Sequence, residues 1–163
     1  MLMLAVVASG AWLLVAAGVA KVLRPDGTIS ALKSLLGPIG SRAAARLLGG
    51  LELALGGLFL IMPGPVPAAM LTGWFLALSL TALRIRRSDT GCGCFGTAET
   101  QVTWGHVLIT LLLGLSSAAA VMLPAETVPR LLLAASAIPA ALGWYGLLVP
   151  LPALRSDLRA LRA

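Results

Sequence analysis

Five apolar stretches, each near the length needed to cross a lipid bilayer, constrain this chain more than any other feature. They lie at residues 2–23, 44–62, 66–83, 105–123 and 131–149. A transmembrane helix needs about 20 predominantly apolar residues, because the hydrocarbon core is about 30 Å thick. In lipid the backbone must satisfy its own hydrogen bonds, so each stretch is expected to be a helix. The sequence therefore predicts an all-α integral membrane bundle, with a four-helix core and a fifth, C-terminal transmembrane helix.

The composition agrees with this prediction and excludes one class of partner. Apolar residues make up 59% of the chain and charged residues 11%, whereas a soluble domain carries about 25% charged residues. The net charge of +6 does not indicate a nucleic-acid binder, because the basic residues flank apolar stretches and do not gather with aromatic residues on a soluble face. We expect a protein that lies in the lipid bilayer and binds no nucleic acid.

The Lys and Arg residues predict an orientation for the bundle. All twelve except Arg130 fall on one side of the predicted spans, at Lys21, Arg24, Lys33, Arg42, Arg46, Arg84, Arg86, Arg87, Arg155, Arg159 and Arg162. Basic residues are enriched in cytoplasmic loops. The high content of Ala, Leu, Arg and Gly is typical of a GC-rich bacterial genome. We therefore expect a multi-pass protein of the bacterial inner (cytoplasmic) membrane, with the N-terminus outside and the C-terminus and residues 88–100 in the cytoplasm.

Two local features carry further expectations. Between the first two stretches, Ile29, Leu32 and Leu35 follow helical spacing, which fits either a short helix in the membrane interface or an ordered loop. Near the end of the fifth stretch, Trp144 and Tyr145 are typical of an interfacial aromatic belt.

The polar segment SDTGCGCFGTAET, residues 88–100, contains Cys92 and Cys94, and the chain has two cysteines in all. Residues two apart reach disulfide distance only in a tight turn, for which Gly93 supplies the backbone freedom and Gly96 loosens the following chain. Strain makes such a disulfide easier to exchange. This spacing favours a reversible redox pair.

Two other interpretations of the cysteines stay open. Free cysteines are often inert small hydrophobic residues, although these are usually buried inside spans. In the second interpretation, the cysteines form a mixed metal site with His106 and Glu99. One cysteine pair cannot by itself complete a four-ligand zinc site. The favoured interpretation therefore predicts no metal.

Two ionisable residues within the spans are also candidates, together with a histidine at the start of the fourth. Glu52 lies inside the second stretch and Lys21 ends the first. An intramembrane carboxylate marks a functional site or a buried pair, so Glu52 is either paired with Lys21, as a structural contact, or a proton relay near the thiols. His106 opens the fourth stretch and is either a proton acceptor for a thiol or a capping residue.

The segments GVAKVLRP, LELALGGLFL and CGCFG, the last before a stretch that begins with Trp104, resemble the MauE branch of the DoxX-like membrane proteins. The similarity covers about residues 5–125, and CGCFG is its most specific part. We expect residues 1–125 to form the four-span MauE/DoxX-like bundle, with the cysteine loop at 88–100. Residues 126–163 then form a fifth transmembrane helix and a basic tail. Gly91 replaces the Asp that family members often carry before the first cysteine, which leaves partner and substrate open.

The resemblance implies an accessory role in thiol–disulfide chemistry, beside a thioredoxin-like partner that matures a disulfide-rich methylamine dehydrogenase. Carried over by position, Cys92 and Cys94 are the exchanging pair. Our leading hypothesis is a membrane-embedded redox accessory of the thiol–disulfide oxidoreductase kind, which passes reducing or oxidising equivalents to a thioredoxin-like or other redox partner. The alternative is a non-catalytic scaffold subunit of a larger respiratory or redox complex. No cofactor is expected, and a quinone near Glu52 and Lys21 is the remaining candidate.

One conflict stays open at this point. Structural disulfides persist in the extracytoplasmic space, whereas the count of basic residues places the cysteines in the cytoplasm. Three interpretations reconcile the disulfide chemistry with this orientation. The protein carries electrons across the membrane, or the loop dips into the bundle, or the chain is an exception to the charge rule.

Overall fold

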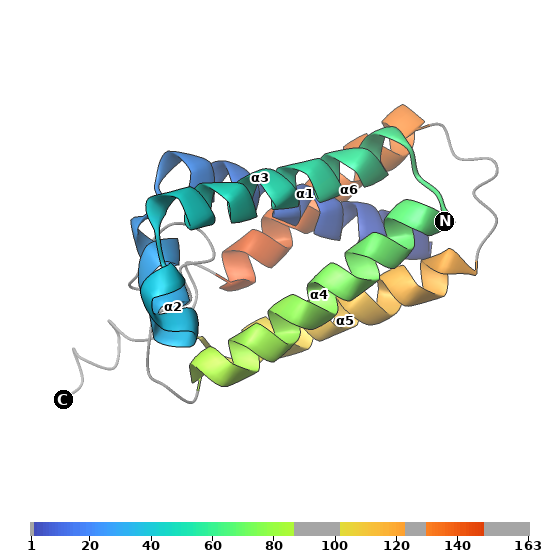
Figure 1. The fold of residues 1–163 in the computed structure, drawn as a ribbon. Helices are drawn as coiled ribbons and strands as arrows, with labels where there is room; N and C mark the ends of the chain where they lie inside the picture. Colours follow the sequence, from blue (N-terminus) through green and yellow to red (C-terminus); the bar gives the residue numbers. More distant parts are fainter. Residues whose placement is uncertain (1, 87–101, 123–129, 149–163) are drawn as a thin grey trace, which may run out of the picture.

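The computed structural model describes residues 2–86, 102–122 and 130–148, and within these ranges the chain consists of helices and short connections, without strands. The helices are α1 (Leu2–Leu23), α2 (Asp26–Leu36), the short 3₁₀ helix η1 (Gly37–Ile39), α3 (Arg42–Ile61), α4 (Pro65–Arg86), α5 (Trp104–Val121) and α6 (Arg130–Leu148). Figure 1 shows them as a bundle with α2 lying across one end. The predicted all-α class is confirmed.

Four helices, α1, α3, α4 and α5, are long and apolar enough to cross a membrane. They coincide within a few residues with the first four predicted stretches. The protein is therefore a multi-pass membrane protein. The fifth predicted stretch does form a helix, α6, which contains Pro139; that α6 crosses the membrane stays a prediction.

Local sequence explains where these helices begin. The hydroxyl of Ser41 precedes α3 and accepts a hydrogen bond of 3.1 Å from the backbone N–H of Ala44, which satisfies one of the unpaired donors at a helix start. Helix α4 begins at Pro65, where a missing N–H costs nothing. Helices α3 and α4 are thus joined by a short turn.

The connection between α1 and α3 is a helix rather than a loop. Helix α2 ends at Gly37, whose φ of 64° is the left-handed conformation that glycine adopts without a steric penalty. Its Ala31 is buried in a cluster with Ile85 of α4 and Val107 of α5. Helix α2 therefore covers the end of the α4–α5 pair.

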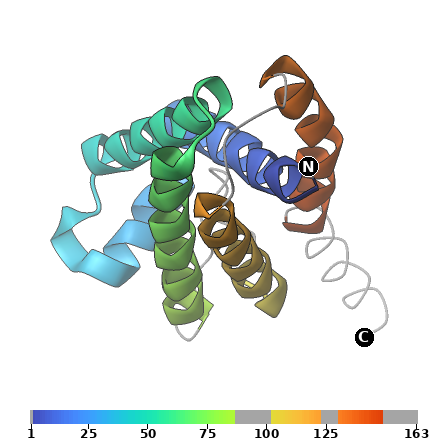
Figure 2. The ribbon, with the colours of Figure 1, turned by 90° about the vertical axis from the view of Figure 1, so that its right-hand side faces the viewer.

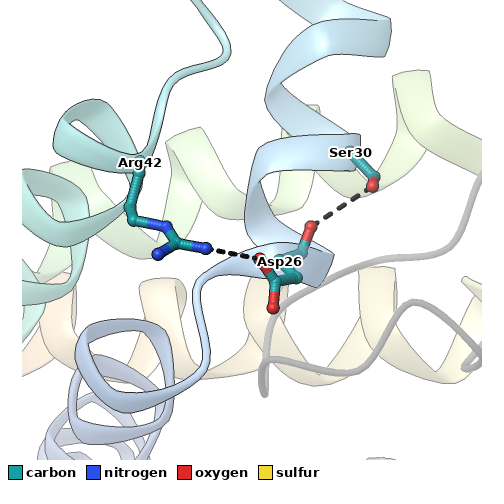
Figure 3. A network of polar contacts seen from close by, with 3 residues as sticks. All are labelled: Asp26, Ser30 and Arg42. Carbon is teal, nitrogen blue, oxygen red and sulfur yellow. Dashed lines mark hydrogen bonds and ion pairs between the residues drawn. The ribbon is translucent and has the colours of Figure 1, made fainter.

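An exposed polar network marks the start of α2. The guanidinium of Arg42, at the start of α3, lies 3.5 Å from a carboxylate oxygen of Asp26, and the Ser30 hydroxyl donates to the Asp26 carbonyl oxygen (Figure 3). Because both charged side chains are largely exposed, this pair adds little stability. It shows that α2 and α3 begin side by side.

Helix α1 is the central element of the bundle. It packs against α3, α5 and α6, while α4 and α5 lie side by side (Figures 1 and 2). The core between them includes Phe59, Leu71 and Phe75, all almost fully buried. Large apolar side chains that face outward, such as Leu80 and Leu112, suit a lipid surrounding.

The side chain of Trp144 contacts helix α1. Its indole Nε1 donates a hydrogen bond of 3.1 Å to the Ser9 hydroxyl of α1, and its ring packs against the main core cluster. A tryptophan N–H that leaves water usually finds a partner. Trp144 therefore joins α6 to α1, and the interfacial belt stays a prediction.

Basic residues collect at one end of the described bundle. This is the end where α1 and α4 finish, where α2 lies and where α3 begins (Figure 1). The residues are Lys21, Arg24, Lys33, Arg42, Arg46, Arg84 and Arg86. We call it the basic end. That it faces the cytoplasm stays a prediction.

Candidate functional site

Helices α1 and α3 approach each other closely because glycines lie where they cross. A Cβ atom on Gly18 would lie 2.6 Å from the carbonyl oxygen of Gly49, and one on Gly56 would lie 2.5 Å from that of Ala11. Such distances are too short for a real Cβ, so a larger residue requires the helices to separate. Small residues permit this close packing in lipid.

This close approach brings Lys21 and Glu52 together. The Nζ atom of Lys21 lies 2.5 Å from Oε2 of Glu52, and the two residues are only 4% and 0% exposed. Burying a charge in lipid is costly unless it is paired. The pair therefore fixes the end of α1 against the middle of α3. It is the contact that the sequence suggested, whereas a proton-relay role for Glu52 stays a prediction.

The second oxygen of the Glu52 carboxylate, Oε1, is buried and has no hydrogen-bond partner among the described residues. The indole of Trp74 on α4 is a donor close to this carboxylate, although its buried Nε1 makes no hydrogen bond of ordinary length. Native proteins seldom leave buried polar atoms unpaired. The Trp74 indole is therefore the donor best placed to serve the second oxygen of Glu52.

His106 is held at the start of α5. Its Nδ1 accepts a hydrogen bond of 3.2 Å from the backbone N–H of Thr103 and lies 3.0 Å from the Thr103 hydroxyl. This is the reciprocal arrangement of a capping box, in which a side chain satisfies a free donor at the helix start. The capping role weighed from the sequence is therefore present, and a part in thiol chemistry stays a prediction.

Glu52, Lys21 and His106 all line one cavity near the basic end. Its volume is ≈120 Å³, and its wall is mainly aliphatic, from α1, α2, α3, α4 and α5. Three threonines also line it: Thr28, Thr81 and Thr110. The hydroxyl of Thr110 is already engaged, since it donates to the carbonyl oxygen of His106 in its own helix. The cavity is therefore an apolar space with a charged pair in its wall.

Sequence reasoning missed several of these features. The threonines and Trp74 were not singled out, although a polar residue within an apolar span tends to face the bundle interior. That tendency was the available signal for Thr81 and Thr110. No signal in the sequence identified the cavity, because it depends on how five helices meet.

The two helices that flank the cysteine segment contact each other next to it. The guanidinium of Arg86, the last residue of α4, lies 3.9 Å from the centroid of the Trp104 ring, which opens α5. A cation over an indole face is attracted by its π electrons. The predicted residues Cys92, Gly93, Cys94 and Gly96 themselves lie outside the described residues. The structure thus locates the base of their segment, at the basic end.

Within the described ranges, no group of three or more His, Cys, Asp or Glu side chains is placed to hold a metal ion. Since Cys92 and Cys94 lie outside those ranges, the expected absence of a metal stays a prediction.

Comparison with known proteins identifies the family. The model of the family described as methylamine utilisation protein MauE matches residues 1–125, a range that contains α1 to α5. Searches of curated proteins and of solved structures return no match. The link to the wider DoxX-like proteins stays a prediction. The matched range includes the buried Lys21–Glu52 pair and the residues that flank the cysteine segment. Since it covers most of the sequence, the chain belongs to the MauE family of methylamine utilisation proteins.

Proposed function

We propose that this membrane protein is a thiol–disulfide redox accessory in methylamine utilisation, in which Cys92 and Cys94 alternate between dithiol and disulfide. Membership of the MauE family supports an accessory role in that process. The exchange partner is a thioredoxin-like or other redox protein. The proposed location is the bacterial inner membrane.

The contact between Arg86 and Trp104 carries the proposal. It joins the last residue of α4, before the cysteine segment, to the first residue of α5, after that segment, with 3.9 Å between the guanidinium carbon and the ring centroid. Residues on both sides of the segment, Ile85 and Val102, are buried in one cluster with α2. Flanks held together in this way support the proposal, because closing a loop costs less chain entropy when the residues that flank it are already near each other.

The proposed exchange balances as follows. The thiolate of one cysteine attacks a sulfur of the partner's disulfide and forms a mixed disulfide. The second cysteine then attacks that bond and releases the partner as a dithiol. Two electrons and two protons pass from Cys92 and Cys94 to the partner, and the reverse sequence returns them. Arg84 and Arg86, in the last turn of α4 shortly before the cysteines in the chain, supply the positive charge that favours the thiolate form that starts each step.

The first test is mass-shift alkylation with a maleimide, before and after reduction. Because the chain has two cysteines, the wild type is expected to gain two labels only after reduction when it is isolated in its oxidised state. A Cys92→Ser or Cys94→Ser single variant cannot close the ring, so one of the two is expected to accumulate a mixed disulfide with the partner on a non-reducing gel.

The double variant, with both cysteines replaced by serine, is the control and is expected to form no adduct. The proposal is wrong if neither cysteine changes state under any redox poise. If the double variant also supports full growth on methylamine, the protein acts as a non-catalytic scaffold instead.

A second test concerns orientation. Since basic residues gather where the cysteine segment begins and ends, an impermeant maleimide is expected to label Cys92 and Cys94 in inverted membrane vesicles and not in intact spheroplasts. A single cysteine introduced at Met62, exposed between α3 and α4 at the opposite end, should label with the reverse pattern on a Cys92→Ser/Cys94→Ser background. Labelling of the native pair from outside contradicts the charge-based orientation.

A further inference from the structure

The apolar cavity near the basic end is partly open, and its open side lies between α3 and α4. These two helices diverge towards α2 (Figure 1), because α3 packs mainly on α1 and α4 mainly on α5. Leu48 of α3 and Leu78 of α4 line the cavity and are only partly buried, whereas every cavity-lining residue of α1 is buried. Helix α1 therefore closes the back of the cavity, and the opening faces the surrounding lipid.

The flank of α4 that borders this opening leads to an exposed cation. Leu78 and Thr81 are three residues apart and both line the cavity. Trp74, one turn before Leu78, lies near Glu52 of α3, so this flank of α4 faces α3. Arg84 follows Thr81 by three residues, which places it on the same flank, one turn nearer the basic end. Its side chain is exposed.

The basic end carries more positive charge than the described carboxylates neutralise. Those carboxylates are Asp26 and Glu52, and each already pairs with a basic residue. Four exposed basic residues have no carboxylate partner within the described ranges: Arg24, Lys33, Arg46 and Arg84. Clusters of this kind attract anionic lipid headgroups at the membrane surface. The basic end therefore complements a negatively charged headgroup.

The cavity has the size and depth expected for part of a lipid chain. Its volume of ≈120 Å³ is comparable with the ~150 Å³ of an apolar cavity that takes up benzene, so it suits about six carbon atoms. It extends from Ala31 of α2 to Leu13 and Leu113, near the middle of α1 and α5. An empty cavity leaves its mainly aliphatic wall without contact partners, and a chain restores those contacts.

We propose that this cavity takes up part of one acyl chain of an anionic phospholipid, which enters from the membrane between α3 and α4. The headgroup stays at the basic end, beside Arg84. Since lipid chains and the cavity wall are equally apolar, the headgroup supplies the selectivity and no polar group inside the cavity is needed. The inference concerns binding only, goes beyond the proposed redox function and does not depend on it.

The test measures lipid binding to the full-length protein by native mass spectrometry from detergent micelles. Phosphatidylglycerol and phosphatidylcholine with identical chains are titrated separately. The first copy of phosphatidylglycerol is expected to bind about fivefold more tightly, which is the effect of one basic residue near an anionic headgroup. Glycerol 3-phosphate, which carries the charge but no chain, is expected not to compete. Equal binding of the two phospholipids, or competition by glycerol 3-phosphate, overturns the proposal.

Two arginine variants locate the headgroup. Arg84→Gln is expected to remove the preference for phosphatidylglycerol. Arg46→Gln is the matched control, because Arg46 is also exposed and without a carboxylate partner among the described residues. It lies two residues before Leu48 and therefore on another face of α3, so the preference is expected to persist. If the two variants lower the preference equally, the whole basic end selects the lipid and the proposed site is wrong.

Two alanine variants of α4 locate the chain. Ala82→Leu adds three carbon atoms at the buried wall of the cavity and is expected to weaken binding of phosphatidylglycerol about tenfold. Ala77→Leu makes the same change at an exposed position that does not line the cavity and is expected to bind like the wild type. Unchanged binding in Ala82→Leu would place the chain outside the cavity and contradict the inference.

A further variant and a control complete the experiment. Should Ala82→Leu fail to fold, Leu78→Trp narrows the partly exposed mouth of the cavity and is expected to weaken binding in the same way. Binding that is unaffected by Leu78→Trp counts against entry between α3 and α4. The Cys92→Ser/Cys94→Ser variant is expected to bind phosphatidylglycerol like the wild type, so failure of this inference is distinguishable from failure of the proposed function.

Discussion

Replacing Lys21 with methionine is expected to destabilise the protein by about 3–5 kcal/mol, because it leaves Glu52 as an uncompensated buried charge. The carboxylate is fully buried and lies near the middle of α3, where it cannot reach water by a change of rotamer. Lys21 is its one charged partner in the described structure. The free energy of unfolding, measured by denaturant titration in mixed micelles, reports the loss.

The double variant Lys21→Met/Glu52→Leu distinguishes pairing from packing. Apolar residues of similar volume often replace a buried ion pair without loss, so the double variant is expected to recover most of the stability. Asp26→Asn is the matched control, since it breaks an ion pair between largely exposed side chains and is expected to cost ~0.5 kcal/mol or less. Additive losses from the two single variants would mean that Lys21 and Glu52 do not interact.

Replacing Gly56 with alanine is expected to destabilise the protein by about 2–3 kcal/mol. The new Cβ would lie 2.5 Å from the carbonyl oxygen of Ala11, a backbone atom that cannot turn aside. Helices α1 and α3 must therefore separate, which strains or breaks the contacts along their crossing. The Lys21–Glu52 pair lies one turn away on the same face and weakens with them.

Gly57 supplies an unusually close control. It is the next residue of α3, and a Cβ there would meet nothing within 4 Å. Gly57→Ala is expected to stabilise the helix by up to about 1 kcal/mol, since alanine loses less backbone entropy. Gly49 and Gly50 form a second such couple. If both members of a couple respond alike to substitution, the close approach of α1 and α3 is not what glycine provides.

The spans could be predicted from the sequence because lipid imposes a simple rule. An apolar run of the right length must be a helix, so α1, α3, α4 and α5 followed from local composition alone. The starts of α3 and α4 also carried local signals, in Ser41 and Pro65. The Lys21–Glu52 contact could also be suggested, because a charge buried in lipid is costly unless an opposite charge pairs with it.

Other features could not be predicted, because they depend on which helix faces touch. The choice between helix and loop for α2 was settled by burial of Ala31 against α4 and α5, which no local pattern specifies. Trp144 suits a membrane interface by composition, yet the position of Ser9 on α1 gives its indole a partner inside the bundle. The cavity arises where five helices meet, and the sequence of each helix alone does not indicate it.

The central place of α1 has a consequence for biosynthesis. This helix leaves the ribosome before its partners α3, α5 and α6. Until α3 is inserted, Lys21 has no counter-charge, and until α6 arrives, Ser9 has no indole to accept from. During synthesis, α1 therefore lies in the bilayer with polar side chains that have no partners yet. A truncated product keeps these unpaired groups, by which membrane quality-control factors can recognise it.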